Sequence, residues 1–206
     1  IAQTALPEAM VLTASQEEEL APTDIPFSPS AIGIGIGMGT SAYAQGTLAA
    51  LLRNFPTIPF VIDADALNLV ASSEGLLRAL PKNTILTPHP KELERLIGKW
   101  SDDLDRQAKA KEFAKKHKVI LVLKGAFTMI TDGDHFWVNS TGNPALATAG
   151  SGDVLTGVIT GLLSQGYTPL NAAIVGVYIH GKAADTYVRN TKKNTMIASD
   201  IIDFLS

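Results

Sequence analysis

Short apolar runs alternate with helix-spaced stretches through much of the chain, between residues 31 and 123. Runs rich in Val and Ile indicate buried strands, whereas apolar residues three or four positions apart indicate amphipathic helices. Alternation of the two predicts an α/β fold in which a mostly parallel central sheet is covered by helices on both faces. The expected strands are 31–37, 59–63, 84–87 and 119–123, and the expected helices are 41–54, 66–80 with a break near Ser72, 90–98 and 102–116.

The remaining segments complete one domain over residues 1–206. Residues 128–131 and 135–139 flank Asp132-Gly133-Asp134, which predicts a hairpin. From Gly152 onward we expect helices, broken at 164–169 and again at 190–194. We interpret Gly157 and Gly161 as positions of close helix packing. The first 30 residues carry an acidic, proline-containing stretch that we expect to connect other parts of the chain, not to build the core.

Composition narrows the function classes. The chain has 206 residues, of which 46% are hydrophobic and 18% are charged, and its net charge is -3. These values fit a globular domain with no basic surface for nucleic acid. We therefore interpret the short basic run at 115–118 as the exposed end of a helix, not as a binding patch. Without cysteine, disulfides and thiolate metal sites are excluded. No apolar run approaches the length of a membrane span, and the first residues show no signal-peptide pattern. We therefore expect a cytoplasmic protein without a membrane partner.

A glycine loop at 140–153 precedes an apolar stretch with helical spacing. The N–H groups at a helix N-terminus favour an anion, and we expect Gly150, Ser151 and Gly152 to form an anion hole. Asp153 falls on the first helical turn, where a carboxylate beside a bound phosphate is suited to take a proton from an attacking hydroxyl. The loop therefore predicts phosphoryl transfer, with Asp153 as the catalytic base.

Glycines and acidic residues follow the first two expected strands. The glycine-rich segment 33–39 lacks the Lys-Ser/Thr ending of a phosphate loop. It therefore indicates either a tight turn or a site where a ligand can lie against the backbone of Gly37 and Gly39. On an extended strand end, Asp63 and Asp65 would point to one side, as hydrated Mg²⁺ requires. Alternatively, Asp65 caps a helix that begins at Ala66.

Further chemical groups follow the next two strands. Pro88 and Pro90 restrain His89, which predicts a histidine presented to a ligand, although a lone histidine is often structural. We expect Glu92 to hold metal-bound water, or alternatively to favour the helix N-terminus by its charge. Lys124 leaves a buried strand beside glycine, where it can meet nucleotide phosphates. Because the carboxyl ends of parallel strands share one edge, these groups should converge there.

Taken together, residues 31–163 resemble the ADP/ATP-dependent NAD(P)H-hydrate dehydratases, a branch of the ribokinase-like superfamily. Ile36 and Lys91 stand where that family often has proline and glycine. The family's first strand and helix units have no counterpart before Ala31, so we expect a ribokinase-like domain with missing N-terminal units. The motifs that carry the resemblance are Gly37-x-Gly39, Asp63-Ala-Asp65-Ala-Leu-Asn68, Thr87-Pro-His89-Pro-x-Glu92, Lys124-Gly125-x-x-Thr128 and Gly142-Asn143-Pro144 through Asp153.

The resemblance implies repair of hydrated NADH or NADPH at the expense of ADP or ATP, with Mg²⁺ as cofactor and a homotetramer as the assembly. It implies that Gly39, His89 and Asp153 contact the hydrate. Two alternatives are a small-molecule kinase of the same superfamily, acting on a vitamin-precursor alcohol, and a non-catalytic nucleotide-binding module. The residues implied to contact the nucleotide are Lys124, Gly125, Ala126, Phe127, Thr128 and Gly152.

Overall fold

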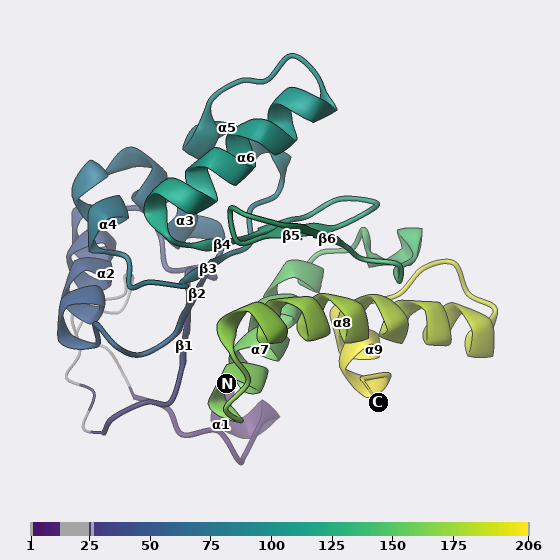
Figure 1. The fold of residues 1–206 in the computed structure, drawn as a ribbon. Coiled ribbons are helices and arrows are strands. Elements are labelled where there is room, and N and C mark those ends of the chain that lie inside the picture. The colour runs from purple at the N-terminus through teal and green to yellow at the C-terminus, as the bar shows by residue number, and fades with distance from the viewer. Residues whose placement is uncertain (1, 13–24, 26, 206) are drawn as a thin grey trace.

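A six-stranded sheet forms the centre of the computed structural model, which describes residues 2–12, 25 and 27–205 (Figure 1). The strands lie in chain order, with β1 to β4 parallel and β5 and β6 added as an antiparallel hairpin. In register, Gly33 pairs with Val61, Val61 with Ile85, and Ile85 with Ile120. The strands are β1 (Ile32–Ile34), β2 (Phe60–Ile62), β3 (Ile85–Leu86), β4 (Ile120–Leu123), β5 (Met129–Thr131) and β6 (Phe136–Val138).

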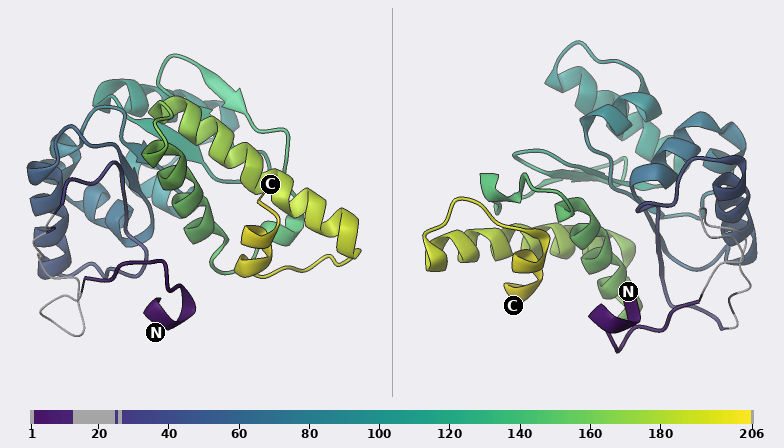
Figure 2. Two further views of the ribbon diagram at one scale, coloured as in Figure 1. Left: turned by 90° about the horizontal axis from the view of Figure 1, so that it is seen from below. Right: turned by 180° about the vertical axis from the view of Figure 1, so that it is seen from behind.

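Helices cover both faces of this sheet, as the sequence pattern predicts (Figure 2). Helices α2 to α6 lie on one side, whereas α7 and α8 lie on the other. The longer helices are α2 (Ala42–Asn54), α3 (Ala64–Ser72), α5 (Pro90–Ile97), α6 (Asp103–His117), α7 (Ser151–Ser164) and α8 (Pro169–Thr191). The short ones are α1 (Ala2–Ala5), α4 (Glu74–Ala79), α9 (Ala198–Asp203) and the 3-10 turn η1 (Pro144–Leu146).

Alternation along the strands divides the core in two. On β4, Leu121 and Leu123 pack against the α2–α6 layer, whereas Ile120 and Val122 pack against α7 and α8. Side chains that alternate across a pleated strand supply both cores at once. This explains why the central strands are continuously apolar. Because β1 to β4 are parallel, the loops that follow them lie at one edge of the sheet.

Several expected boundaries differ from the structure. The first strand was expected to be buried over 31–37, but β1 spans only three residues and lies at a sheet edge, with Gly33 exposed. The second helix begins at Ala64 instead of Ala66, because Asp63 ends the strand and caps the helix itself. The helix break expected near Ser72 is confirmed at Ser73. Residues 13–24 and 26, part of the expected connecting stretch, lie outside the described residues.

Glycines of the last two long helices do not all serve close packing. A sequence interpretation of Gly157 and Gly161 as packing positions is wrong, because a Cβ atom at either would meet nothing within 4 Å. The close approach occurs on α8. There a Cβ at Gly176 would lie 2.7 Å from Ile159 Cγ1, and one at Gly181 would lie 2.4 Å from Thr141 Oγ1.

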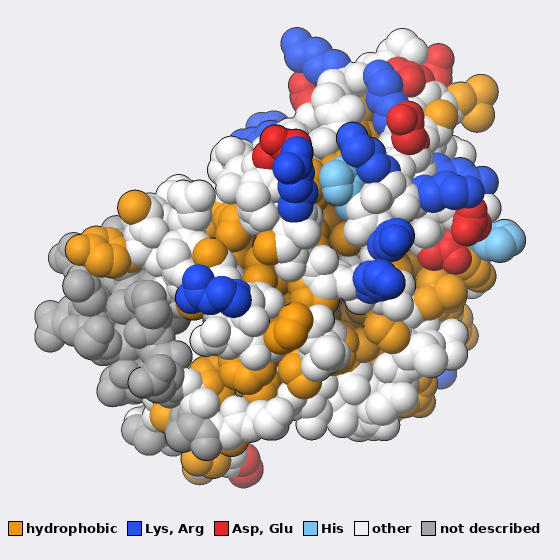
Figure 3. All heavy atoms as spheres, turned by 60° about the vertical axis from the view of Figure 1, so that its left-hand side comes forward, with side chains coloured by type: hydrophobic (Ala, Val, Ile, Leu, Met, Phe, Trp, Pro, Cys, Tyr) orange, Lys and Arg blue, Asp and Glu red, His pale blue; other side chains and the backbone are white. Residues whose placement is uncertain are grey.

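The surface carries interspersed charges. On the face drawn in Figure 3, Lys and Arg side chains lie among acidic and hydrophobic ones. The basic run 115–118 ends α6, as expected, and Lys115 Nζ pairs with Asp134 Oδ1 at 2.8 Å. Within the described ranges, none of the helices combines the length and the apolar character needed to cross a membrane.

Candidate active site

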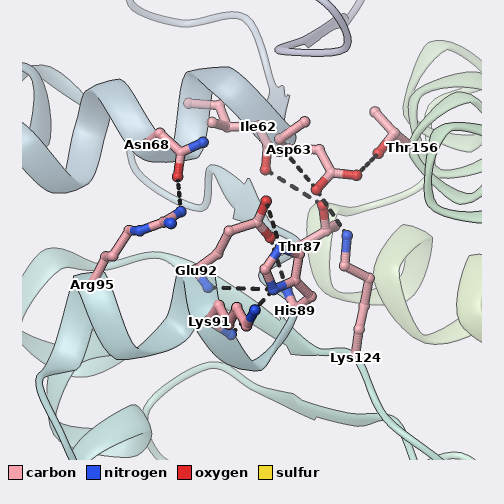
Figure 4. A network of polar contacts seen from close by, with 11 residues as sticks. Ile62, Asp63, Asn68, Thr87, His89, Lys91, Glu92, Arg95, Lys124 and Thr156 are labelled. Carbon is pink, nitrogen blue, oxygen red and sulfur yellow. Dashed lines mark hydrogen bonds and ion pairs between the residues drawn. The ribbon is translucent and has the colours of Figure 1, made fainter. Parts of the chain in front are cut away.

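The carboxyl ends of β2, β3 and β4 bring together residues that are far apart in the sequence (Figure 4). Asp63 follows β2, His89 follows β3, and Lys124 follows β4. The first turns of α7 reach the same place, because a Cβ built on Gly152 would lie 3.4 Å from Lys124 Nζ and 3.6 Å from Asp63 Oδ2. The predicted convergence at one edge of the sheet is therefore confirmed for these groups.

Asp63 is the centre of a buried polar network. Its Oδ1 accepts from the Ala64 N–H at 2.8 Å and pairs with Lys124 Nζ at 2.8 Å. Its Oδ2 accepts from Thr156 Oγ1 at 2.9 Å. Only 3% of the Asp63 side chain is exposed, so these donors replace the water that a carboxylate requires. The network fixes the Lys124 ammonium group next to the N-terminus of α7.

The expected pairing of Asp63 with Asp65 as magnesium ligands on one side of a strand end is wrong. The chain is not extended there, since Ala64 has a φ of 48° and already belongs to α3. Asp65 lies in the first turn of α3, and its Oδ2 accepts from the Gly39 N–H at 3.0 Å. The alternative of Asp65 as helix cap is also wrong, because Asp63 is the cap. Asp65 instead ties the glycine turn after β1 to this helix.

His89 and Glu92 form a capping box at the start of α5. His89 Nδ1 accepts from the Lys91 and Glu92 N–H groups at 3.1 and 3.4 Å, while Glu92 Oε2 accepts from the His89 N–H at 2.8 Å. Pro90 occupies the first helical turn, as predicted. Glu92 thus has the structural role that its position favours, and its binding of metal-bound water stays a prediction. The His89 side chain is 47% exposed, so its outer face remains accessible to a ligand.

The N-terminus of α7 carries the predicted catalytic base. Gly150 has a φ of 82°, a conformation that favours glycine, and the helix has no side-chain cap. The first N–H groups of an uncapped helix are open to an external acceptor. Of the expected anion-hole residues, Ser151 already donates its N–H to the Thr148 carbonyl, at a long 3.4 Å. Asp153 is exposed on the first turn, where its carboxylate is accessible.

Residues that sequence reasoning missed hold this helix end in place. His180 of α8 is buried, and its Nε2 lies 3.0 Å from the Ser151 carbonyl oxygen. Burial is the main cause that lowers the pKa of His180, and the Lys124 charge lowers it further, against the Ser151 carbonyl contact, which raises it. The sequence could have pointed to Thr156, because it follows Gly152 by four residues and therefore lies on the same face of the helix. His180 had no such signal.

The glycine loop itself is anchored to α8. Thr141 Oγ1 donates to the Tyr178 carbonyl at 2.8 Å, and Asp185 Oδ2 accepts from the Gly142 N–H at 3.0 Å. Gly181 leaves room for this contact. The loop is therefore held by α8 before it enters α7.

The predicted nucleotide loop follows β4. Thr128 Oγ1 donates to the Gly125 carbonyl at 3.2 Å, which closes the turn. Gly125, Ala126 and Phe127 are exposed, so backbone and side chain are available to a ligand. Contact of residues 124–128 and Gly152 with a nucleotide stays a prediction, as does contact of Gly39, His89 and Asp153 with a hydrate.

The described residues do not fit a magnesium site built by protein alone. Among them, no group of three or more His, Cys, Asp or Glu side chains is placed to hold a metal ion. The Asp63 oxygens are occupied by nitrogen and hydroxyl donors, and both Glu92 oxygens face His89. Magnesium in phosphate-transfer sites commonly takes only one or two carboxylates together with substrate phosphates.

The sequence matches a known protein family. A family model described as NAD(P)H-hydrate dehydratase matches residues 1–206. An ADP-dependent (S)-NAD(P)H-hydrate dehydratase of Neisseria meningitidis is 44% identical over 158 residues, covering 74% of this chain and 53% of that protein. A bifunctional NAD(P)H-hydrate repair enzyme of Moorella thermoacetica is 40% identical over 191 residues, covering 91% of this chain and 35% of that protein.

A solved structure shares the fold as well. An ADP/ATP-dependent NAD(P)H-hydrate dehydratase from Bacillus subtilis, co-crystallized with ATP/Mg²⁺, has a TM-score of 0.72 and 34% identity. The match covers 90% of this chain and 65% of that one. The chain thus spans about a third of the Moorella protein and about half of the Neisseria protein. The ribokinase-like fold expected from the sequence is confirmed by such neighbours.

Proposed function

This chain belongs to the NAD(P)H-hydrate dehydratase family, and we propose on that basis that it converts hydrated NADH or NADPH back to the reduced cofactor at the expense of ADP or ATP. The observation that carries the proposal is the position of Asp153. It is an exposed carboxylate on the uncapped N-terminus of α7, and the Lys124 ammonium group lies next to Gly152, the residue before it. A base next to an anion site is the arrangement that phosphorylation of a hydroxyl requires.

The reaction follows from these groups in two steps. Asp153 accepts the proton of the hydroxyl on the hydrated nicotinamide ring, and that oxygen bonds to the terminal phosphorus of the nucleotide. The bond between this phosphorus and the rest of the nucleotide breaks at the same time, so AMP leaves from ADP, or ADP from ATP. The bond between the ring carbon and the ester oxygen then breaks, and the phosphate group leaves as inorganic phosphate. The ring nitrogen lone pair supplies the electrons, and loss of a proton from the adjacent ring carbon restores the double bond.

In this scheme, the chain's own residues position the hydrate and stabilise the phosphate that is transferred. The open N–H group of Gly152 and the Lys124 ammonium group bind the transferred phosphate as charge develops on it, while His89 contacts the hydrate. A magnesium ion that came with the nucleotide would supply positive charge to offset that of the phosphates. Because the described residues offer no metal cluster, we expect the ion to arrive with the nucleotide.

Turnover tests this proposal. The chain is incubated with hydrated NADPH, Mg²⁺ and either ADP or ATP, and the absorbance of the reduced cofactor is followed. Recovery of that absorbance with release of inorganic phosphate is expected. A stable phosphorylated product would instead indicate a kinase, and nucleotide binding without any turnover would indicate a binding module.

The assembly is a further proposal. The family resemblance implies a homotetramer. The mass in solution, measured by light scattering, tests this assembly, and a monomer that turns over the hydrate would contradict it.

A further inference from the structure

Helix α8 lies along α7 and holds both ends of the glycine loop that leads into it (Figure 1). The beginning of the loop bonds to α8 through Thr141 and Gly142. Its end meets α8 through His180, whose Nε2 lies 3.0 Å from the Ser151 carbonyl oxygen. A Cβ atom at Gly181 would lie only 2.4 Å from Thr141 Oγ1, so α8 sits directly against the loop.

The His180 ring is the donor in its contact with Ser151. A carbonyl oxygen only accepts hydrogen bonds, so the ring nitrogen that lies 3.0 Å from it, Nε2, carries a proton. The Ser151 hydroxyl oxygen, 3.4 Å from the same nitrogen, can accept or donate and does not decide the tautomer. Burial lowers the pKa of His180, so near neutral pH the ring is uncharged and this proton is its only one.

This hydrogen bond sets the direction of the next N–H group along the chain. The peptide bond from Ser151 to Gly152 is trans and planar, so its C=O and N–H groups point in opposite directions. Holding the Ser151 carbonyl toward α8 therefore turns the Gly152 N–H out of the helix end. Within the described residues, the Ser151 and Val154 N–H groups bond to preceding carbonyls at 3.4 and 3.0 Å, whereas the Gly152 N–H has no such partner.

The Gly152 N–H lies beside a fixed positive charge. A Cβ atom at Gly152 would be 3.4 Å from Lys124 Nζ, and Asp63 Oδ1 holds that ammonium group at 2.8 Å. Donors that are already aimed at a developing negative charge stabilise it most, because they need not reorganise during the reaction. The direction of the Gly152 N–H therefore matters to phosphoryl transfer, and His180 sets this direction from outside the site.

We propose that His180 is a positioning residue of the anion hole, whose hydrogen bond to the Ser151 carbonyl aims the Gly152 N–H at the transferred phosphate. The inference rests on the proposed function and assigns to α8 the alignment of that site. His180 itself touches neither the nucleotide nor the hydrate in this assignment. Its effect passes through a single peptide group.

Kinetics with a pair of His180 variants test this role. His180→Leu keeps a buried side chain without a donor, whereas His180→Gln offers an amide N–H near the position of Nε2. We expect the leucine variant to lower kcat at least about tenfold and to change KM for the hydrate less than about twofold, because the affected charge develops only during the reaction. The glutamine variant should keep kcat within about threefold of the unmodified chain.

A matched control lies on the same helix. Tyr187→Phe removes another hydrogen bond of a buried α8 side chain, from the Tyr187 hydroxyl to the Thr195 carbonyl at 3.0 Å. It should leave kcat unchanged. Equal losses in the leucine and glutamine variants, or a leucine variant whose kcat stays within about twofold of the unmodified chain, would overturn the assignment.

Nuclear magnetic resonance tests the same geometry without turnover. The ring nitrogen signals of His180, assigned by their loss in His180→Gln, should show a neutral imidazole with its proton on Nε2. On addition of ATP and Mg²⁺, the Gly152 amide proton should shift downfield in the unmodified chain and in the glutamine variant. This test also holds if the leucine variant does not fold.

The outcomes separate this inference from the proposed function. A His180 proton on Nδ1, or a Gly152 signal that does not respond to ATP, would overturn the positioning role. Absence of turnover by the unmodified chain would instead refute the proposed function and leave the resonance test in force.

Discussion

Replacing Thr156 by valine isolates the hydrogen bond that we consider most important to the buried network. Valine has nearly the shape of threonine but cannot donate to Asp63 Oδ2, which lies 2.9 Å from the Thr156 hydroxyl. Both residues are 2% exposed, so water cannot easily take the place of the lost donor. The other two contacts of the carboxylate are on Oδ1 and cannot compensate.

The expected magnitude follows from this burial. A hydrogen bond to a charged buried acceptor contributes about 1.5 to 3 kcal/mol, and we expect Thr156→Val to lower the free energy of unfolding by about 2 kcal/mol. For a domain of this size, that loss corresponds to a fall in Tm of about 4 to 8 °C. Urea unfolding followed by circular dichroism measures the change, provided that both proteins have the same m-value.

A matched control lies one turn along the same helix. Thr160 Oγ1 donates to the Thr156 carbonyl at 2.7 Å, a contact within α7 that leaves no charged group behind when it is lost. Thr160→Val is therefore expected to change stability by less than about 0.5 kcal/mol. If Thr156→Val loses no more than this control, the Asp63 carboxylate is satisfied by water and the buried network is refuted.

Four further substitutions test other parts of the site and of the helix packing. Gly152→Ala places a methyl group 3.4 Å from Lys124 Nζ, so we expect unchanged folding but a KM for the nucleotide raised about tenfold; an unchanged KM would contradict close phosphate approach. Because burial lowers the pKa of His180, its unfolded form binds protons more readily; stability should fall as pH drops below about 6.5, and urea titrations should show a flatter dependence in His180→Gln. Gly157→Ala should stabilise by about 0.5 to 1 kcal/mol and Gly176→Ala should destabilise; the reverse order of their Tm values would show that the Gly157 face is packed.

Local sequence signals predicted the parts of the fold that depend on near neighbours. The start of α2 within one residue of the expected position 41, Pro90 in the first turn of α5 and the hairpin around Gly133 are each set by residues within a few positions. The strand-end residues could be grouped because parallel strands share an edge. The chemistry of Asp153 and Lys124 at these positions suggested their roles before the family motifs did, and those roles stay predictions.

Contacts over long sequence distances were not predictable in this way. Asp63 was expected to bind magnesium, whereas its partners Lys124 and Thr156 lie 61 and 93 residues away. No periodicity reports such a contact. Likewise, helical spacing cannot tell which glycine faces a neighbouring helix, so Gly157 was chosen where Gly176 makes the close approach.

The rate of hydrate dehydration by Asp153→Asn tests the central claim most directly. The substitution keeps the size and polarity of the side chain on an exposed first turn, so folding and nucleotide binding should be retained. Loss of the base is expected to lower the rate by about a hundredfold to ten-thousandfold relative to the unmodified chain. A variant that keeps more than about a tenth of that rate would contradict the role of Asp153 as the base.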